Sequence, residues 1–307
     1  MSLSDQVAAP APEPARPRAP RPNLRRSLRS WRSLFSAALS VLALAMTILA
    51  LTPLFSVLWM VIVRGGAKLR PSLFIELPPA AGMPGGGIGN AVVGTILMVV
   101  IASAIAVPLG ILAAVFIGEF APESRASTAA RFAAKILTGM PSILAGVFAY
   151  TVVVLATGTF SAWAGGFALA ILMVPIVVLT AADAIQGVPR KMREAAIGMG
   201  ATRSQVVWHV VLPTARPAIL TGVMLAVARA AGETAPLLFT ALFFDYWPHP
   251  PFTEPTSSLA VLIYNFSGVP YPNMVGMAWT AALVLVVLVL ATNIIAQVVT
   301  GRSEHSR

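Results

Sequence analysis

The chain has 307 residues, of which 57% are hydrophobic and only 10% are charged. A soluble domain of this composition would expose too much apolar surface, so the sequence indicates an integral membrane protein. The formal net charge of +10 does not indicate nucleic acid, because the positive residues cluster beside the hydrophobic segments, as membrane topology requires. Cysteine is absent, which excludes disulfides and thiolate metal sites.

The N-terminal segment, residues 1–33, carries seven arginines and the proline-rich run PAPEPARPRAPRP. Because it lacks the apolar residues needed for a core, we predict a disordered, basic cytoplasmic tail. An uncleaved first span over 34–63 follows. As a helix it is about 45 Å long, which exceeds the thickness of the hydrocarbon core. Residues 64–89 are predicted to form a periplasmic loop.

Six apolar segments are long enough to cross a bilayer. They cover residues 34–63, 90–117, 136–158, 163–182, 218–244 and 274–299. The last five form the predicted transmembrane domain of residues 90–299, and residues 300–307 are predicted to form a cytoplasmic C-terminal tail. The predicted fold class is therefore all-α and polytopic, with six transmembrane helices.

The lysines and arginines predict the orientation of these spans. An even number of spans places both termini on one side, which also carries the loops 118–135 and 184–216. That side holds 17 of the 21 positive residues, whereas the opposite loops hold only Arg64, Lys68 and Arg70. The positive-inside rule therefore predicts that both termini and the 184–216 loop are cytoplasmic.

The loop 184–216 contains the stretch EAAIGMGATRSQVVWHVVLP, which begins at Glu194. We predict a short helix up to about Met199, a left-handed turn at Gly200, and a second helix over 205–211 that stops near Pro213. Such a two-helix elbow suits docking to a cytoplasmic partner. Basic loops also lie on anionic lipid routinely, so spacing alone leaves both interpretations open.

This stretch resembles the EAA loop of permeases from bacterial binding-protein-dependent ABC importers. The resemblance implies the type I ABC importer permease fold, with the loop as a coupling helix that enters a cleft of a partner ATPase. The ATPase-coupling residues it implies are Glu194, Ala195, Ala196, Gly200, Leu212 and Pro213. The chain has no G-x-x-x-x-G-K-[ST] motif, so ATP has to be bound by a partner and no cofactor is expected on this chain.

A second motif, RAAGETAPLLFT, begins at Arg229 inside the predicted fifth span. Arg229 and Glu233 stand four residues apart on one helix face, and an ionised group costs at least ~2.5–3.5 kcal/mol at the centre of a membrane helix. Two interpretations remain open. Either the residues form a neutralised pair that pins one helix to another, or Arg229 helps an anion to pass while Glu233 holds it in place or limits its affinity. Gly232 and Pro236 loosen the backbone there, either as a hinge or as a tolerated kink.

The same motif resembles phosphate-specific transport permeases of the PstA type, as do residues 89–122 and the string GMPSILAGVFAY at 139–150. The resemblance extends from residue 85 to the C-terminus. Two segments depart from the family pattern: the basic tail, and FIGEF at 116–120, where the family more often has tyrosine-leucine before the acid. The implied substrate is inorganic phosphate, and the implied pathway residues are Arg229, Glu233, Thr234 and Ser142.

The resemblance also implies the surroundings of the protein. These are the bacterial inner membrane and its lipid, a homologous second permease, two ATPase subunits and a periplasmic phosphate-binding protein. Alternatives are a permease for molybdate, sulfate or a phosphonate, and, from another class, a secondary transporter or a signalling membrane protein.

The remaining polar residues carry less information. Ser142 follows Pro141, which breaks the third predicted span, and its hydroxyl either lines the pathway or bonds to its own backbone. His209, His249 and His305 have no metal-ligand spacing, and no Ser/His/Asp constellation is present. We therefore predict no metal site, no catalytic residues and no enzymatic activity on this chain.

Overall fold

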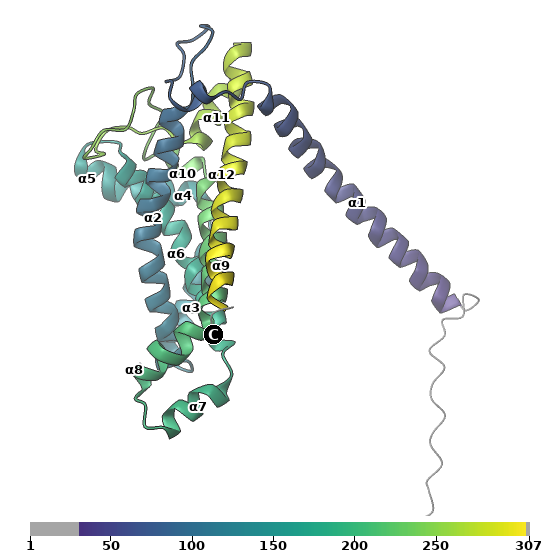
Figure 1. The fold of residues 1–307 in the computed structure, drawn as a ribbon, viewed down its shortest axis with the longest axis vertical. Helices are drawn as coiled ribbons and strands as arrows, with labels where there is room; N and C mark the ends of the chain where they lie inside the picture. The colour runs from purple at the N-terminus through teal and green to yellow at the C-terminus, as the bar shows by residue number, and fades with distance from the viewer. Residues whose placement is uncertain (1–30, 305–307) are drawn as a thin grey trace, which may run out of the picture. The chain divides into compact units, whose positions relative to one another are not determined.

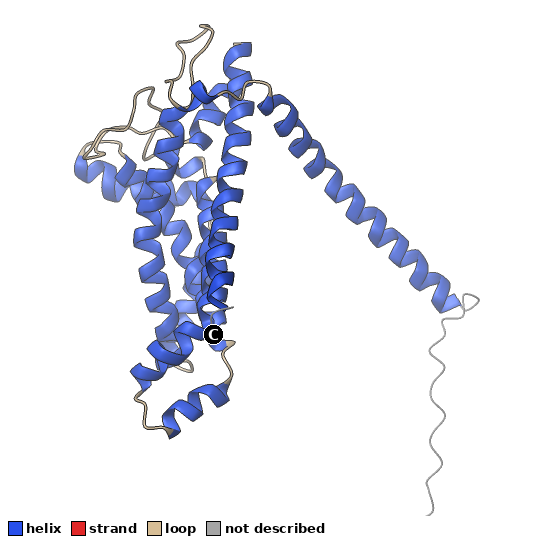
Figure 2. Ribbon diagram, in the orientation of Figure 1, coloured by secondary structure: helices blue, strands red, loops and turns tan. Residues whose placement is uncertain are grey.

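The computed structural model describes residues 31–304, which contain helices and loops but no strand (Figures 1 and 2). Five helices are long and apolar enough to cross a membrane, or six if one bent pair counts as a single span. This confirms the predicted all-α, multi-span class. Contacts divide the chain into two units, residues 1–56 and 57–307, of which the second contains all the helices after α1. The predicted tail falls outside the described residues, except for 31–33.

Helix α1, Trp31–Gly66, begins three residues before the predicted first span and has 36 residues. Its last turns belong to the second unit, where they pack against α12, Pro272–Glu304. A Cβ added at Gly65 would lie 2.6 Å from the carbonyl oxygen of Trp279, so only glycine permits this approach. The Arg64 guanidinium lies 5.3 Å from the centroid of the Trp279 ring. The end of α1 is thereby fixed to α12.

The core is built on two parallel helices, α2 (Gly89–Val115) and α6 (Ala162–Gln186), which both run towards the end that carries α7. Small residues let their backbones approach closely, as is typical of membrane helices. Gly110 lies against Val177, and Gly166 lies against Ile101. Helix α6 is the most deeply buried of the candidate spans, with 67% of its apolar window inside the protein. It therefore positions the other helices.

The third predicted span is not one straight helix. Helix α3 (Arg125–Thr138) and helix α4 (Ser142–Ala149) meet at 103° across residues 139–141. Pro141 occupies the N-cap of α4, so the predicted break at Pro141 is confirmed. A π turn, η3 (Tyr150–Val154), and the short α5 (Leu155–Thr157) complete this segment.

The fifth span differs from the prediction at both ends. Helices α8 (Arg203–Val206), η4 (Val207–Val211) and α9 (Leu212–Ala231) form one continuous span of 29 residues. The helix therefore does not stop near Pro213, and that prediction was wrong. The π turn η4 widens the backbone before Pro213, whose missing N–H then falls at the start of α9. At its other end the span stops at Ala231, well before residue 244.

The remaining elements lie at the two ends of the second unit (Figure 1). At one end, which we call the α7 end, η2 (Phe116–Phe120) continues α2 and α7 (Arg190–Gly198) follows α6. At the other, η1 (Pro71–Phe74) and α11 (Leu259–Ser267) pack on the start of α12. Helix α12 stays helical to Glu304, beyond the predicted span end at 299.

Candidate functional site

The stretch from Glu194 to Pro213 forms an elbow at the α7 end (Figure 1). Gly200 has φ +90, which confirms the predicted left-handed turn between α7 and α8. A capping box then starts α8: the Thr202 hydroxyl accepts from the Gln205 amide, and the Gln205 side chain accepts from the Thr202 amide. The shape of the elbow is therefore set by interactions between residues that are close in sequence.

The predicted coupling residues divide by exposure. Glu194, Ala195 and Gly200 are exposed, as a docking surface requires. Ala196 is buried in the main core cluster, so it joins the elbow to the protein and does not lie on its surface. Leu212 and Pro213 are half-buried in the continuous helix and are separated from the α7 surface.

Sequence reasoning missed an apolar part of this surface. Three large apolar side chains on α7 and its C-cap are exposed: Met192 (42%), Ile197 (55%) and Met199 (84%). Exposed apolar side chains grouped on one short segment mark interaction surfaces, and methionine adapts well to a partner. The presence of large apolar residues inside an otherwise basic loop could have indicated these exposed side chains from the sequence.

Sequence reasoning also missed a polar anchor beneath the elbow. The Nε and Nη2 of Arg193 donate to Oε1 of Glu119 in η2, with the Nε bond at 2.9 Å. The same guanidinium donates to the backbone oxygens of Ile185, at 2.7 Å, and Val188. Both side chains are largely buried, with exposed fractions of 17% for Arg193 and 12% for Glu119. One side chain of α7 thus binds the ends of α2 and α6.

The Arg229–Glu233 pair lies at the end of α9 and not within a continuous helix. Arg229 is in the last turn, where a positive charge is favoured by the helix dipole, and Gly232 is the C-cap. Arg229 Nε lies 3.5 Å from Glu233 Oε1, which is long for a hydrogen bond. The exposed fractions are 42% for Arg229 and 16% for Glu233. The structure thus brings the predicted pair together and, among residues 31–304, leaves the other guanidinium donors of Arg229 without a hydrogen-bond partner.

After this break the chain turns into α10, Ala235–Leu238, with Pro236 in its first turn and buried. The backbone of Pro236 packs against α4: a Cβ added at Gly146 would lie 2.6 Å from the Cα of Pro236. The predicted interruption at Gly232 and Pro236 is present, whereas its role as a hinge stays a prediction. The segment that follows the charged pair is wedged between α4 and α6.

The other two predicted pathway residues are less closely tied to the pair. Thr234 is half-buried, and its backbone oxygen accepts hydrogen bonds from the backbone amides of Leu237 and Leu238. Ser142 is half-buried at the start of α4. Among residues 31–304 no hydrogen bond joins Ser142 or Thr234 to Arg229 or Glu233, so their place on the pathway stays a prediction.

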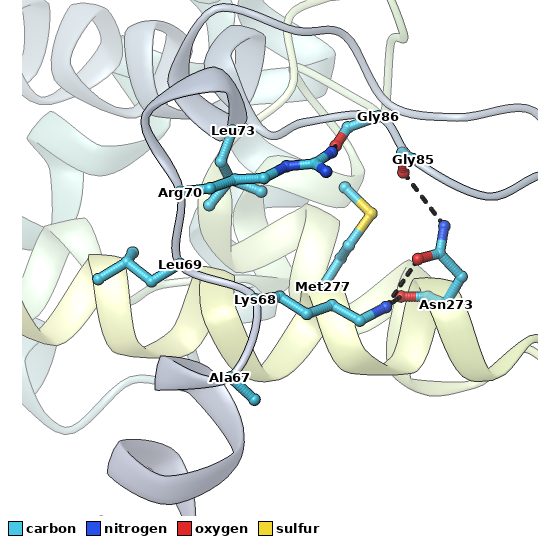
Figure 3. Close-up of a pocket in the computed structure, with 9 residues that line it drawn as sticks. All are labelled: Ala67, Lys68, Leu69, Arg70, Leu73, Gly85, Gly86, Asn273 and Met277. Atoms are coloured by element: carbon cyan, nitrogen blue, oxygen red, sulfur yellow. Dashed lines mark hydrogen bonds between the residues drawn. The ribbon is translucent and has the colours of Figure 1, made fainter.

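At the end opposite α7, the loop after α1 forms a basic cavity of about 270 Å³ (Figure 3). Lys68 Nζ donates to the backbone oxygen of Asn273, at 2.9 Å, and to its Oδ1, at 2.6 Å. The Asn273 amide in turn donates to the oxygens of Met83 and Gly85. Burial lowers the pKa of Lys68 from its ordinary value, and the charge of Arg70 lowers it further. These contacts latch the 67–88 loop onto α12.

Comparison with known proteins identifies the family. Residues 106–305, which include both the elbow and the Arg229–Glu233 break, match the family described as "Binding-protein-dependent transport system inner membrane component". The chain belongs to this family. As a member, it is a multi-pass membrane component of a binding-protein-dependent transport system and not an enzyme.

Curated relatives extend the similarity over most of the chain. It is 37% identical over 281 residues to the "Phosphate transport system permease protein PstA" of Yersinia pestis, covering 92% of this chain and 95% of that one. It is 38% identical to the protein of the same description from Haemophilus influenzae, covering 86% and 93%. A "probable" PstA from Methanocaldococcus jannaschii is 37% identical over 80% of this chain and 87% of its own.

A solved structure supports the fold of this family member. The chain superposes on a subunit in an inward-facing structure of the MetNI methionine ABC transporter with a TM-score of 0.57. The match covers 71% of this chain and 94% of that one at 20% sequence identity. At this identity the likeness supports the ABC importer permease fold alone.

Proposed function

We propose that this chain is a permease subunit of an ATP-driven importer of inorganic phosphate. The observation that carries the proposal is the 37% identity over 92% of the chain to a phosphate transport permease. The chain would form the translocation pathway with a homologous second permease. Two ATPase subunits would bind at the α7 end, and a periplasmic phosphate-binding protein would deliver substrate at the opposite end.

The distribution of charge supports the α7 end as the cytoplasmic end. The segments 118–135 and 184–216 at this end carry eight lysines and arginines, whereas the 64–89 loop at the other end carries only three. The exposed Met192, Ile197 and Met199 then face the cytoplasm, where no lipid covers them and an ATPase cleft would.

The exposure of Arg229 supports its role in the pathway. A guanidinium that is 42% exposed at the end of a membrane span would be costly against lipid, by at least ~2.5–3.5 kcal/mol near the bilayer centre. The side chain therefore needs protein, water or an anion beside it. A guanidinium donates two parallel hydrogen bonds to an oxyanion and stays charged at every physiological pH. Arg229 would steer phosphate, and Glu233 would keep the anion from binding too tightly.

The substrate is tested by uptake of radiolabelled phosphate in cells that depend on this chain as their phosphate permease. Unlabelled phosphate should compete fully, while molybdate, sulfate and a phosphonate at the same excess should not. Uptake that is blocked by one of these anions would assign the permease to that anion. Uptake that persists after ATP depletion would contradict an ABC mechanism.

The role of Arg229 is tested separately with Arg229→Gln, which keeps length and polarity but removes the charge. We expect uptake to be lost while the variant chain assembles with its partners as well as the wild type. Glu233→Gln, the matched variant, should retain binding of phosphate but release it more slowly. Normal uptake by Arg229→Gln would remove the residue from the pathway.

A further inference from the structure

The Arg193–Glu119 anchor connects three elements that the family match does not relate to each other. Arg193 belongs to α7, Glu119 belongs to the π turn η2, and Ile185 lies in the last turn of α6. The two ion-pair partners are 74 residues apart in the chain. All three elements meet at the α7 end, directly beneath the exposed surface of the elbow.

The packing around the anchor leaves little freedom. A Cβ added at Gly118 would lie 2.7 Å from Cγ2 of Ile185, so η2 and α6 are in direct contact beside Glu119. Ile185 itself is fully buried. The guanidinium also donates hydrogen bonds to the backbone oxygens of Ile185, in the last turn of α6, and of Val188, just after it. A positive charge at this end of a helix is favoured by the helix dipole. Short π segments such as η2 occur frequently at functional sites, and here the segment carries Glu119.

The connection between α6 and α7 explains why an anchor is needed. Only residues 187–189 link the two helices, and they end at Pro189, the N-cap of α7. The packing of Ala196 holds the C-terminal half of α7, but without the Arg193 contact a force applied to α7 could still rotate it about this short linker. With the contact, α7 moves together with the ends of α2 and α6. The exposed cations of α7, Arg190 and Lys191, make no comparable contact with these helices among the residues described.

We propose that Arg193 and Glu119 are positioning residues that transmit movement of α7 to α2 and α6. This inference rests on the proposed function, in which an ATPase moves α7. Because the four donor bonds use the planar fork of the guanidinium, the charge alone is not sufficient. Arg193→Lys should therefore impair transmission although it preserves the charge. Glu119→Gln preserves the shape and removes the ion pair.

The test uses the complete transporter, reconstituted with its ATPase, its second permease and a phosphate-loaded binding protein. ATP hydrolysis and phosphate uptake are measured together, so that phosphate moved per ATP can be calculated. In Arg193→Lys and Glu119→Gln we expect normal assembly and basal ATP hydrolysis. Phosphate moved per ATP should fall by about two- to thirtyfold, the range of coupling changes of ~0.5–2 kcal/mol.

Asp183→Asn is the matched control. Asp183 also lies in the last turn of α6 and pairs with Arg131 of α3 at 3.3 Å, but among residues 31–304 no hydrogen bond or ion pair joins it to α7. This variant should transport phosphate with the wild-type ratio. The double variant Glu119→Gln/Arg193→Lys should be no worse than the more impaired single variant, because both changes break the same contact.

Three results would overturn the inference while leaving the proposed function intact. The first is a wild-type ratio in the assembled single variants. The second is an equal loss in Asp183→Asn, and the third is lower assembly with an unchanged ratio in the complexes that form. Absence of phosphate transport by the wild-type complex would instead contradict the proposed function.

Discussion

Gly200 allows the sharpest test of how the elbow is built. Its φ of +90 is a conformation that L residues rarely adopt, and a Cβ placed there would meet nothing within 4 Å. Gly200→Ala therefore changes conformational preference without creating a clash. A positive φ costs an alanine about 1–2 kcal/mol, and the loss of glycine's freedom in the flexible state offsets ~0.4–1 kcal/mol of this. We expect a net cost of about 1 kcal/mol, which weakens docking roughly fivefold.

The measurement is the affinity of the purified ATPase for the permease pair held in nanodiscs. Gly198 provides the control, because a Cβ added there would also meet nothing within 4 Å, but it lies in helix α7 with an ordinary φ. Gly198→Ala should bind as well as the wild type or better, since alanine is favoured in a helix by about 0.8–1.0 kcal/mol. Gly200→Asn should fall between wild type and Gly200→Ala, because asparagine tolerates positive φ.

The reasoning would be refuted if Gly200→Ala bound normally while Gly198→Ala bound weakly. That pattern would mean that the affinity for the ATPase depends on the absence of a side chain at Gly198 and not on the left-handed turn at Gly200.

Two further predictions concern the packing and the loop latch. Gly146→Ala should lower the free energy of unfolding of the solubilised permease by about 1–3 kcal/mol, because the new methyl group would press on the backbone of Pro236; an unchanged unfolding temperature would contradict this. Asn273→Ala should speed amide exchange in the 67–88 loop about fivefold, since it removes a side-chain acceptor of Lys68 and both donors to the loop. Glu76→Gln, at an exposed ion pair with 42% of the side chain accessible, should leave exchange nearly unchanged; equal effects of the two variants would rule out the latch.

Hydropathy and local signals predicted much of this fold. Long apolar runs identified the membrane class, because a helix in lipid has to satisfy its own backbone. The turn at Gly200 and the break at Pro141 were also correct, since each depends on the conformational limits of one residue and its neighbours. These features are local, so a single sequence contains them.

The errors arose where the same local sequence is compatible with two backbone conformations, a helix that ends and a helix that continues. Pro213 indicated a helix end, but the π turn η4 before it let the span continue from 203 to 231. The string around Arg229 was apolar enough to continue as a helix, yet the chain breaks after Ala231. Gly232 and Pro236 indicated a loosened backbone there, but the end of the helix at this point is favoured by packing of Pro236 against Gly146, a tertiary contact that the local sequence does not reveal.

The Arg193–Glu119 anchor shows the same limit for the candidate site. Both residues lie in segments with a recognisable sequence pattern, 116–120 and 184–216, but nothing in their spacing relates them. The pairing requires α2 and α6 to end side by side. The exposure of Met192, Ile197 and Met199 likewise depends on how α7 is turned.

The central claim is that this chain moves phosphate when an ATPase acts on its α7 end. The most direct measurement is phosphate uptake into proteoliposomes that contain the complete transporter, with ATP supplied only to the side that carries α7. We predict uptake of phosphate, driven from the binding protein on the opposite side and abolished by Arg229→Gln. Uptake without ATP, or ATP-driven movement of sulfate or molybdate in place of phosphate, would contradict the claim.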